Sequence, residues 1–233
     1  MSKLSKLKAD LRRHASPEKA KLLQGFFKTG PGQYGEGDIF LGVTVPNSRA
    51  VAKKYHDLSF DEIKALLQSK IHEERLTALL LLVHLYQTTE NKKQIYDYYL
   101  AHTRYVNNWD LVDLTAHKIV GAHLEDKPRD ILYKLAKSDL LWERRISIIS
   151  TFHFTNKKDF KDAIALAEVL LHDKHDLMHK AVGWVLREIG KKDIEVLKTF
   201  LKKHYKEMPR TALRYAIEKF PEEKRQAYLR GKI

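Results

Sequence analysis

The amino-acid sequence predicts an all-α protein built from stacked helices, and three observations support this fold class. Amphipathic runs with capping signals recur along the chain. Six of the ten glycines lie between Gly25 and Gly42. The densest apolar segments, LTALLLLVHLY and RISIISTF, are too long for isolated strands. We therefore expect helices interrupted by one extended glycine-rich loop at residues 30–42.

Two capping motifs mark where predicted helices begin. Ser16 precedes Pro17 and Glu18. Ser59 has Glu62 three residues later, which forms a capping box. Helices are therefore expected to start near residues 17 and 60. Further amphipathic runs, separated by short polar turns, cover about residues 47–56, 72–88, 91–101, 108–124, 128–137, 140–153, 158–172, 176–190, 192–203, 209–219 and 221–229.

Three residues recur at an interval typical of helical repeats. Arg145 follows Trp109 by 36 residues, and Trp184 follows Arg145 by 39. Both intervals approach the roughly 40 residues of a two-helix solenoid repeat. If each repeat contributes one helix to an inner wall, the three side chains project onto one concave surface. The alternative is that the tryptophans are large core residues.

The charge balance points to a polyanionic partner. The chain has 43 Lys and Arg against 30 Asp and Glu, a formal net charge of +13, while 43% of its residues are hydrophobic. A folded protein of this charge attracts polyanions, of which nucleic acid is the commonest and an anionic membrane the second. High solubility is the alternative meaning of the charge.

The sequence also excludes several kinds of site. It contains no cysteine, which rules out a disulfide framework, a thiolate zinc site, an iron–sulfur cluster and a cysteine nucleophile. The N-terminal segment MSKLSKLKADLRRH has no apolar core of signal-peptide length, and no later segment approaches a membrane span. We therefore expect a soluble, cytoplasmic protein that does not contact a membrane.

A carboxylate and an indole ring share one predicted helix face. In NNWDLVDL, Asn108 is the expected N-cap, and Trp109 and Asp113 lie four residues apart. Asp110 lies in the first turn, where a negative charge interacts favourably with the helix dipole, so we expect a structural role for it. An isolated helical Asp is ordinarily exposed to solvent. The pairing with Trp109 on an otherwise apolar helix makes Asp113 a candidate catalytic carboxylate.

Basic and aromatic residues combine in the next two predicted repeats. Of Arg144 and Arg145, one is expected to face the cleft. Lys180, Trp184 and Arg187 follow at spacings of four and three on related faces of one helix. This mixture suits DNA, because cations neutralise phosphates and aromatic faces contact sugars and bases. The alternative places the tryptophan in the core and the arginines on a solvated rim.

Three other kinds of site are excluded or disfavoured. HEERL at residues 72–76 begins like a zincin helix but lacks its second histidine. His172, His175 and His179 have ligand-like spacing, but a new helix is expected to start at His175, which disfavours a metal site. The glycine-rich GPGQYGEGD is followed by no Lys-Ser or Lys-Thr and is not a nucleotide-binding phosphate loop. We expect no metal and no cofactor.

Five segments spread over nearly the whole chain carry a family resemblance: FFKTGPGQYGEGDIFLGVTVP, NNWDLVDLTA, LWERRISIISTFHF, HKAVGWVLREIGKKD and MPRTALRYAIEKFPEEKRQAYL. Together they resemble the AlkD-type DNA alkylation repair glycosylases, all-α proteins of HEAT-like repeats that remove positively charged N3- and N7-alkylpurines. The resemblance implies a HEAT-like helical-repeat solenoid with a concave basic cleft. A chain of 233 residues is too short for two large independent domains, so we expect a single domain over residues 1–233.

The resemblance also assigns roles to individual residues. The family's catalytic carboxylate falls on Asp113, its cleft tryptophans on Trp109 and Trp184, its catalytic-site arginine on Arg145, and a backbone-contacting arginine on Arg187. A cleft tyrosine aligns with Phe26, which keeps the ring and loses the hydroxyl, and a polar residue near the lesion aligns with Thr44. Further DNA contacts are expected from Arg144, Lys180, Arg210 and Arg214.

Two features concern the activity that the resemblance implies. The glycine-rich insertion at 30–38 is longer than in the best-known form of the family. Some relatives of this fold have lost the Trp and Asp pair and bind DNA without cleaving it, whereas this sequence keeps Trp109 and Asp113.

The implied reaction needs little from the enzyme. A cationic alkylpurine leaves without a strong general acid, so a carboxylate at Asp113 would stabilise the sugar cation and orient a water. The damaged base need not enter a deep pocket, unlike the base in the usual base-flipping glycosylase. The expected partner is double-stranded DNA containing alkylated bases. We expect a monomer with no obligate protein partner.

Two functions of other classes are alternatives to a DNA glycosylase. The first is a non-catalytic HEAT-like module that binds damaged, bent or branched DNA, and the intact Trp109 and Asp113 pair argues against it. The second is a helical scaffold for protein partners, which predicts an apolar concave face and binding insensitive to salt. The net charge of +13 disfavours the scaffold.

Overall fold

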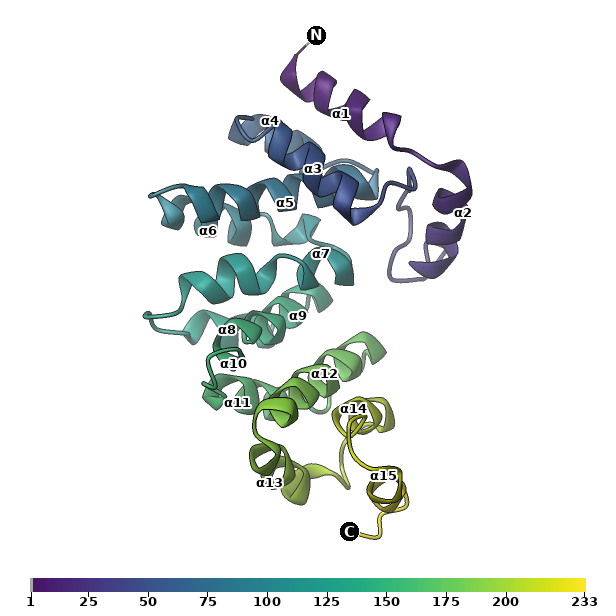
Figure 1. The fold of residues 1–233 in the computed structure, drawn as a ribbon, viewed down its shortest axis with the longest axis vertical. Coiled ribbons are helices and arrows are strands. Elements are labelled where there is room, and N and C mark those ends of the chain that lie inside the picture. Colours follow the sequence, from purple (N-terminus) through teal and green to yellow (C-terminus); the bar gives the residue numbers. More distant parts are fainter. Residues whose placement is uncertain (1) are drawn as a thin grey trace. The chain divides into compact units, whose positions relative to one another are not determined.

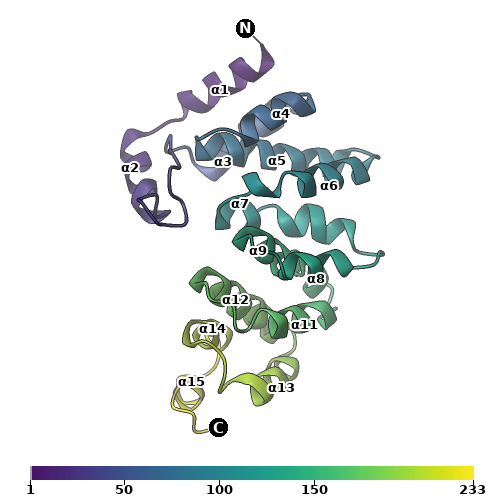
Figure 2. The ribbon, with the colours of Figure 1, turned by 180° about the vertical axis from the view of Figure 1, so that it is seen from behind.

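The computed structural model describes residues 2–233, and this part of the chain is all-helical, as predicted. Within it, the one β pairing is an isolated bridge between Ile39 and Ile71. The chain forms two compact units, one ending at Thr115 and one beginning at Ala116, and each consists of short helices (Figures 1 and 2). The fold-class prediction is confirmed. One continuous domain over residues 1–233 stays a prediction.

The first unit is built around its longest helix, α5. Its helices are α1 (Lys3–Arg13), α2 (Pro17–Phe26), α3 (Val45–Lys54), α4 (Phe60–Leu67), α5 (His72–Thr88), α6 (Lys92–Ala101), the 3-10 turn η1 (Thr103–Tyr105) and α7 (Trp109–Asp113). Helix α5 packs against α3, α4 and α6 and also contacts α1 and α7 (Figure 1). Every residue from His72 to Val83 is buried. From Leu76 onward this is expected of a helix that is apolar on nearly all sides.

The predicted capping motifs begin two of these helices. Ser59 and Glu62 form the reciprocal capping box at the start of α4. The Ser16 hydroxyl accepts a hydrogen bond from the Lys19 main chain, and Pro17 occupies the first turn of α2. These helix starts are confirmed because they depend on local hydrogen bonds that the sequence motif specifies.

The continuous helix predicted over residues 108–124 is wrong. Helix α7 ends at Asp113, and after a turn the chain enters a π-helical segment, η2 (His117–Gly121). The Thr115 hydroxyl donates to the main-chain carbonyl four residues earlier at 2.5 Å and lies 3.0 Å from the Tyr99 hydroxyl. A side chain bonded in this way bends a helix. Asp113 is therefore the last residue of a very short helix.

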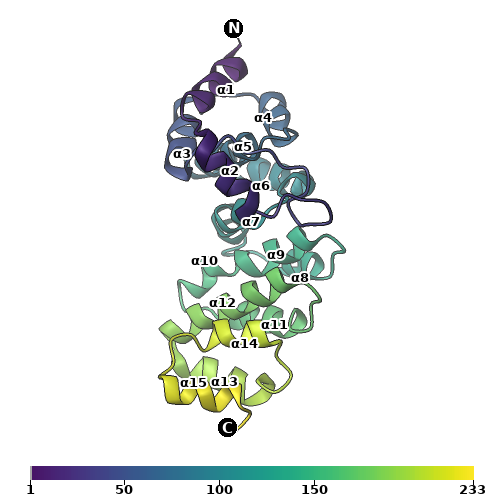
Figure 3. The same cartoon turned by 90° about the vertical axis from the view of Figure 1, so that its right-hand side faces the viewer.

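The second unit is built around α12. Its helices are η2, α8 (Asp130–Ala136), α9 (Leu141–Ser150), α10 (Phe152–Thr155), α11 (Lys161–Val169), α12 (Asp176–Lys192), α13 (Ile194–His204), α14 (Arg210–Ala216) and α15 (Glu222–Leu229). Helix α12 packs against α9, α11, α13 and α14 (Figure 3). Gly183 permits the contact with α14, because a Cβ atom there would lie 2.4 Å from the Ala212 carbonyl oxygen.

One predicted run in this unit is divided. The run over 140–153 becomes α9 and α10, which meet at Thr151. The Thr151 hydroxyl donates to the Ile148 carbonyl at 2.6 Å, so a side chain competes with the main-chain ladder here too. No helix among residues 2–233 is long and apolar enough to cross a membrane.

Candidate active site

The short helix α7 carries Trp109 and Asp113 one turn apart, and both side chains are partly buried. Asn108 caps this helix, as predicted, with its side-chain oxygen 2.8 Å from the Trp109 main-chain nitrogen. Burial raises the pKa of the Tyr99 hydroxyl, and the negative charge of Asp113 raises it further. The Asp113 carboxylate therefore lies within electrostatic reach of a fully buried tyrosine.

Trp109 forms one end of a stack of flat rings. Its ring is stacked on Phe27 with centroids 5.1 Å apart and planes inclined by 15°. Phe27 stacks on Phe40 at 5.0 Å, and Phe40 stacks on His72 at 4.5 Å. Phe27, Phe40 and His72 are buried, whereas Trp109 is partly exposed. The indole ring is thus supported on one face by the core of the unit.

Phe26 lies at the exposed end of this stack. Its ring meets Trp109 edge-on, with centroids 5.9 Å apart, and meets Phe27 edge-on at 5.1 Å. The Phe26 side chain is nevertheless 63% exposed. An exposed aromatic ring beside a partly exposed indole suits contact with a sugar or a base. The structure brings these two predicted site residues together.

Tyr34, from the middle of the glycine-rich loop, reaches the same place. The Trp109 Nε1–H group donates to the Tyr34 hydroxyl oxygen at 3.3 Å, and the hydroxyl donates to the Phe26 carbonyl at 3.4 Å. The sequence reasoning did not select Tyr34. The signal that could have found it is that Tyr34 is the only aromatic residue within the insertion at 30–38.

Two side chains bind main-chain groups of the glycine-rich loop. The Gln24 amide accepts from the Phe40 main chain at 2.9 Å and donates to the Asp38 carbonyl at 3.2 Å. The buried Glu73 carboxylate accepts from three successive main-chain N–H groups at residues 41–43, over 2.8–3.2 Å. A carboxylate that accepts several N–H groups forms strong, charge-assisted bonds.

His72 joins this loop to α7. Its Nε2 atom lies 2.8 Å from Asp110 and its Nδ1 atom 3.4 Å from Asp38. Burial lowers the pKa of His72, but the two carboxylates outweigh burial and raise it above its ordinary value. The expected structural role of Asp110 is confirmed, since its carboxylate also accepts from the Leu111 main chain at 2.9 Å.

Two further charged residues of the HEERL segment form buried ion pairs within the first unit. Glu74 is buried and pairs with Lys8 of α1 at 2.8 Å. Arg75 is buried and pairs with Asp38 at 2.6 Å. These charged residues are consecutive at the start of an otherwise apolar helix, a pattern that signals buried polar partners. The sequence reasoning rejected a zinc site here but missed this role.

The two neighbouring arginines of α9 are both engaged within the second unit. Arg145 is only 4% exposed, and its Nη1 atom donates to the Leu177 carbonyl at 2.7 Å. Arg144 contacts the Asp173 carboxylate through Nε at 2.6 Å and donates through Nη1 to the carbonyls of residues 138 and 139. Arg144 therefore ties two loops together, and its DNA contact stays a prediction.

The candidate residues of α12 lie partly exposed on that helix. Trp184 packs against Phe152 with centroids 4.7 Å apart. Lys180 pairs with Asp176 at 2.8 Å, and Arg187 forms an ion pair with Glu218. On α14, Arg210 and Arg214 are exposed. Arg210 donates to the Leu229 carbonyl. The cleft predicted to be shared by Trp109, Arg145 and Trp184 stays a prediction.

Comparison with known proteins decides the family. A family model described as DNA alkylation repair enzyme matches residues 7–220. The chain belongs to this family. Membership supports a role in alkylation repair as an enzyme and implies that the protein binds DNA. A search of curated proteins by sequence found no significant match.

Two solved structures show the fold of this repair family. A predicted DNA alkylation repair enzyme from Enterococcus faecalis is 18% identical, with a TM-score of 0.69 over 90% of this chain and 98% of that one. AlkD2 from Streptococcus mutans is 20% identical, with a TM-score of 0.56 over 94% of this chain and 97% of that one. The helical-repeat fold predicted for the chain is confirmed.

Thr44 has a structural role in this DNA alkylation repair protein. It is the N-cap of α3, and its hydroxyl accepts from the Asn47 main chain at 3.5 Å. The side chain is partly buried. Its predicted contact with DNA near the lesion stays a prediction.

The histidines considered as metal ligands each have a local partner. His175 caps α12 by accepting from the Leu177 main chain at 3.1 Å. His179 bonds to the Asp173 carbonyl, and His172 lies 3.7 Å from Glu207. Among residues 2–233, no three His, Asp or Glu side chains are grouped so as to hold a metal ion.

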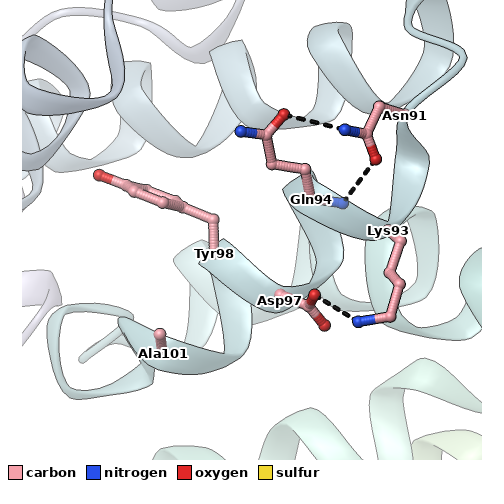
Figure 4. A pocket seen from close by; sticks show the side chains of 6 residues that line it. All are labelled: Asn91, Lys93, Gln94, Asp97, Tyr98 and Ala101. Atoms are coloured by element: carbon pink, nitrogen blue, oxygen red, sulfur yellow. Dashed lines mark hydrogen bonds and ion pairs between the residues drawn. The ribbon is translucent and has the colours of Figure 1, made fainter.

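A hollow of about 540 Å³ on α6 lies in the first unit but contains no predicted site residue. Lys93 pairs with Asp97 at 2.6 Å, and Asn91 and Gln94 are hydrogen-bonded to each other at 3.3 Å (Figure 4). These four polar side chains satisfy one another. Tyr98 also lines the hollow, and burial raises its pKa to about 12, but its hydroxyl donates to the Phe60 carbonyl at 2.8 Å. The lining therefore does not combine a perturbed ionisable group with convergent, unsatisfied polar groups, as a catalytic pocket typically does.

Proposed function

We propose that this DNA alkylation repair protein is a monofunctional DNA glycosylase. Its substrates are cationic N3- and N7-alkylated purines in double-stranded DNA, such as 3-methyladenine and 7-methylguanine. The observation that carries the proposal is the pairing, on the short helix α7, of the partly exposed Trp109 with Asp113. The exposed Phe26 ring against Trp109 adds a second flat surface.

The proposed chemistry is hydrolysis of a bond that is already weak. The bond between C1′ and the purine nitrogen breaks, and the base leaves with the electron pair as a neutral molecule. The sugar becomes an oxocarbenium cation, which the Asp113 carboxylate stabilises electrostatically. Water then adds to C1′ and releases a proton to Asp113 or to solvent. No general acid is required, because the departing base begins as a cation.

Aromatic rings stabilise the same developing charge. The faces of indole rings attract cations, and the stack on Phe27 holds the Trp109 ring in place. We assign the same role to Trp184 in the second unit. Arg145 is the proposed catalytic-site arginine, held by the Leu177 carbonyl, and Arg187 would contact a phosphate of the DNA.

The remaining proposed DNA contacts follow from the positive charge of four side chains. Lys180, Arg144, Arg210 and Arg214 would bind the DNA backbone, so affinity should fall steeply with salt. We propose that the protein acts as a monomer in the bacterial cytoplasm, where chromosomal DNA is its substrate. It needs no cofactor and no obligate protein partner.

Base release from a defined lesion tests the proposal. A duplex with a single 7-methylguanine is incubated with excess protein, and free base is measured for the wild type, Asp113→Asn and the control Asp97→Asn. Asp97 is an exposed residue of α6 in a surface ion pair. We expect Asp113→Asn to lower the release rate about 100-fold without loss of duplex binding, and the control to match the wild type.

Two results would contradict the proposal in different ways. If the wild type releases no base above the spontaneous rate, the glycosylase proposal is wrong, and non-catalytic binding of damaged, bent or branched DNA is the function left. If the wild type and Asp113→Asn release base equally fast, the protein is a glycosylase but Asp113 is not its catalytic carboxylate.

A further inference from the structure

The indole N–H group of Trp109 has a hydrogen-bond partner that comes from the glycine-rich loop. Trp109 Nε1 lies 3.3 Å from the Tyr34 hydroxyl oxygen, although the two residues are 75 positions apart. An indole nitrogen can only donate, so the tyrosine oxygen accepts. The Tyr34 hydroxyl in turn donates to the Phe26 carbonyl at 3.4 Å. The directions of both bonds follow from the chemistry of the groups.

These contacts restrain the Trp109 ring from three directions. Phe27 covers one face of the ring at an interplanar angle of 15°. Phe26 contacts it edge-on. The bond to Tyr34 restrains rotation of the ring within its own plane, which stacking alone does not restrain. The part of the indole that stays exposed is therefore presented in one orientation.

The loop is shaped to place Tyr34 there. Gly35 packs so closely that a Cβ atom would lie 2.5 Å from the Phe27 carbonyl oxygen. The Gly35 main chain donates to the Lys28 carbonyl at 3.2 Å. Lys28 itself has a φ angle of 52°, a conformation that non-glycine residues seldom adopt. Lys28 lies two residues before the loop, so the chain enters the loop in a constrained conformation.

We propose that Tyr34 is a positioning residue for base excision, acting through Trp109. This inference rests on the proposed function. An aromatic ring stabilises a sugar cation only when its face is directed at the charge, so loss of the Tyr34 hydroxyl slows the chemical step. Duplex binding depends mainly on phosphate contacts and changes little. The insertion at 30–38 thereby contributes a hydroxyl to the site.

The test removes only that hydroxyl. Tyr34→Phe is compared with Tyr105→Phe, which removes a hydroxyl that accepts a 3.0 Å bond from Gln68 elsewhere in the first unit. Single-turnover release of 7-methylguanine and the Kd for the same duplex are measured for each. We expect Tyr34→Phe to slow release about three- to ten-fold, with a Kd within about two-fold of the wild type. Tyr105→Phe matches the wild type in both.

A second measurement uses the free protein. The chain has three tryptophans, so its ¹⁵N spectrum contains three indole N–H signals, and Trp109→Phe identifies the one from Trp109. Tyr34→Phe should shift that signal and speed its exchange with water, whereas Tyr105→Phe leaves all three in place. Thermal unfolding of each variant checks that the fold is retained.

The outcomes separate this inference from the proposed function. If Tyr34→Phe excises at the wild-type rate, the inference is overturned while the glycosylase stands. If the Trp109 indole signal does not move in Tyr34→Phe, the positioning contact is overturned whatever the rates are. If the wild type releases no base but the indole signal moves, the proposed function fails and only the positioning of Trp109 is supported.

Discussion

His72 and Asp110 form a hydrogen bond of 2.8 Å inside the first unit. The other nitrogen of the same imidazole faces Asp38 at 3.4 Å, and Arg75 pairs with that carboxylate. His72 thereby links the residue that follows Trp109 to the end of the glycine-rich loop. A doubly bonded imidazole between two carboxylates is best satisfied when it carries both protons.

This arrangement predicts how stability depends on pH. The pKa of His72 is raised above its ordinary value of 6.5. A histidine with a raised folded-state pKa contributes all of its stabilisation below the unfolded pKa and loses it as the pH rises through the folded pKa. We therefore expect the His72 contribution to the unfolding free energy to fall as the pH rises above about 6.5. Urea unfolding at a series of pH values measures this fall.

His72→Gln is the comparison for that experiment. The variant should be less stable at low pH and should lack the fall seen in the wild type. Burial lowers the pKa of His153 and of His175, and stabilisation from such groups is lost as the pH falls instead. Their effect is common to both proteins and cancels in the difference. If the unfolding free energy depended on pH in the same way in His72→Gln and in the wild type, the role of His72 would be contradicted.

Gly183→Ala should destabilise the second unit. A Cβ atom at this position would meet the Ala212 carbonyl oxygen at 2.4 Å, so α12 and α14 must separate. We expect a loss of about 1–3 kcal/mol of unfolding free energy. Gly25→Ala is the matched control, because nothing lies within 4 Å of a Cβ atom there. It should be neutral or raise stability by up to about 1 kcal/mol. Equal effects of the two substitutions would show that the packing of α12 against α14 leaves room for a Cβ atom at Gly183.

Two arginines should affect different properties. Arg144→Ala leaves the Asp173 carboxylate without its 2.6 Å partner, so we expect the free energy of unfolding to fall by about 1–3 kcal/mol. Urea unfolding of the variant and the wild type measures this loss.

Arg214 is exposed and forms no hydrogen bond or ion pair within residues 2–233. Arg214→Ala should therefore leave stability unchanged and reduce the slope of log K against log salt for DNA binding by about one. An unchanged slope would remove Arg214 from the DNA-binding surface.

Glu73→Gln should loosen the glycine-rich loop. The buried carboxylate accepts from the main chain of residues 41–43, and an amide has only one oxygen to offer them. We expect a loss of about 1–3 kcal/mol and faster hydrogen exchange at these three amides. Glu62→Gln, at the exposed capping box of α4, is the control and should leave their exchange unchanged. Slow exchange at 41–43 in Glu73→Gln would mean that the Glu73 carboxylate is not needed to hold this end of the loop.

Helix starts were predictable because capping is local. Ser16 and Ser59 begin α2 and α4 through bonds to main-chain groups three residues away. The break after Asp113 was not predictable from periodicity. The apolar pattern continues through residues 108–124, while the Thr115 hydroxyl that disrupts the ladder is held by the distant Tyr99.

The candidate site also has features that the sequence predicts and features that it does not. The spacing of Trp109 and Asp113 on one helix face is a property of the α-helix, and sequence was enough to predict it. The same holds for the excess of positive charge. Arg144 shows the limit, because no local pattern in the sequence indicates that it pairs with Asp173, 29 residues away, and its DNA contact stays a prediction.

The sequence by itself determined the all-α fold class, the helix starts and the pairing of an indole with a carboxylate, because each depends on neighbours within one or two turns. Only the tertiary structure decided that Tyr34 bonds to Trp109 and that His72 joins Asp38 to Asp110. These partners lie 34 to 75 residues apart. Their meeting depends on how α5 packs against the loop and α7, which no local pattern encodes.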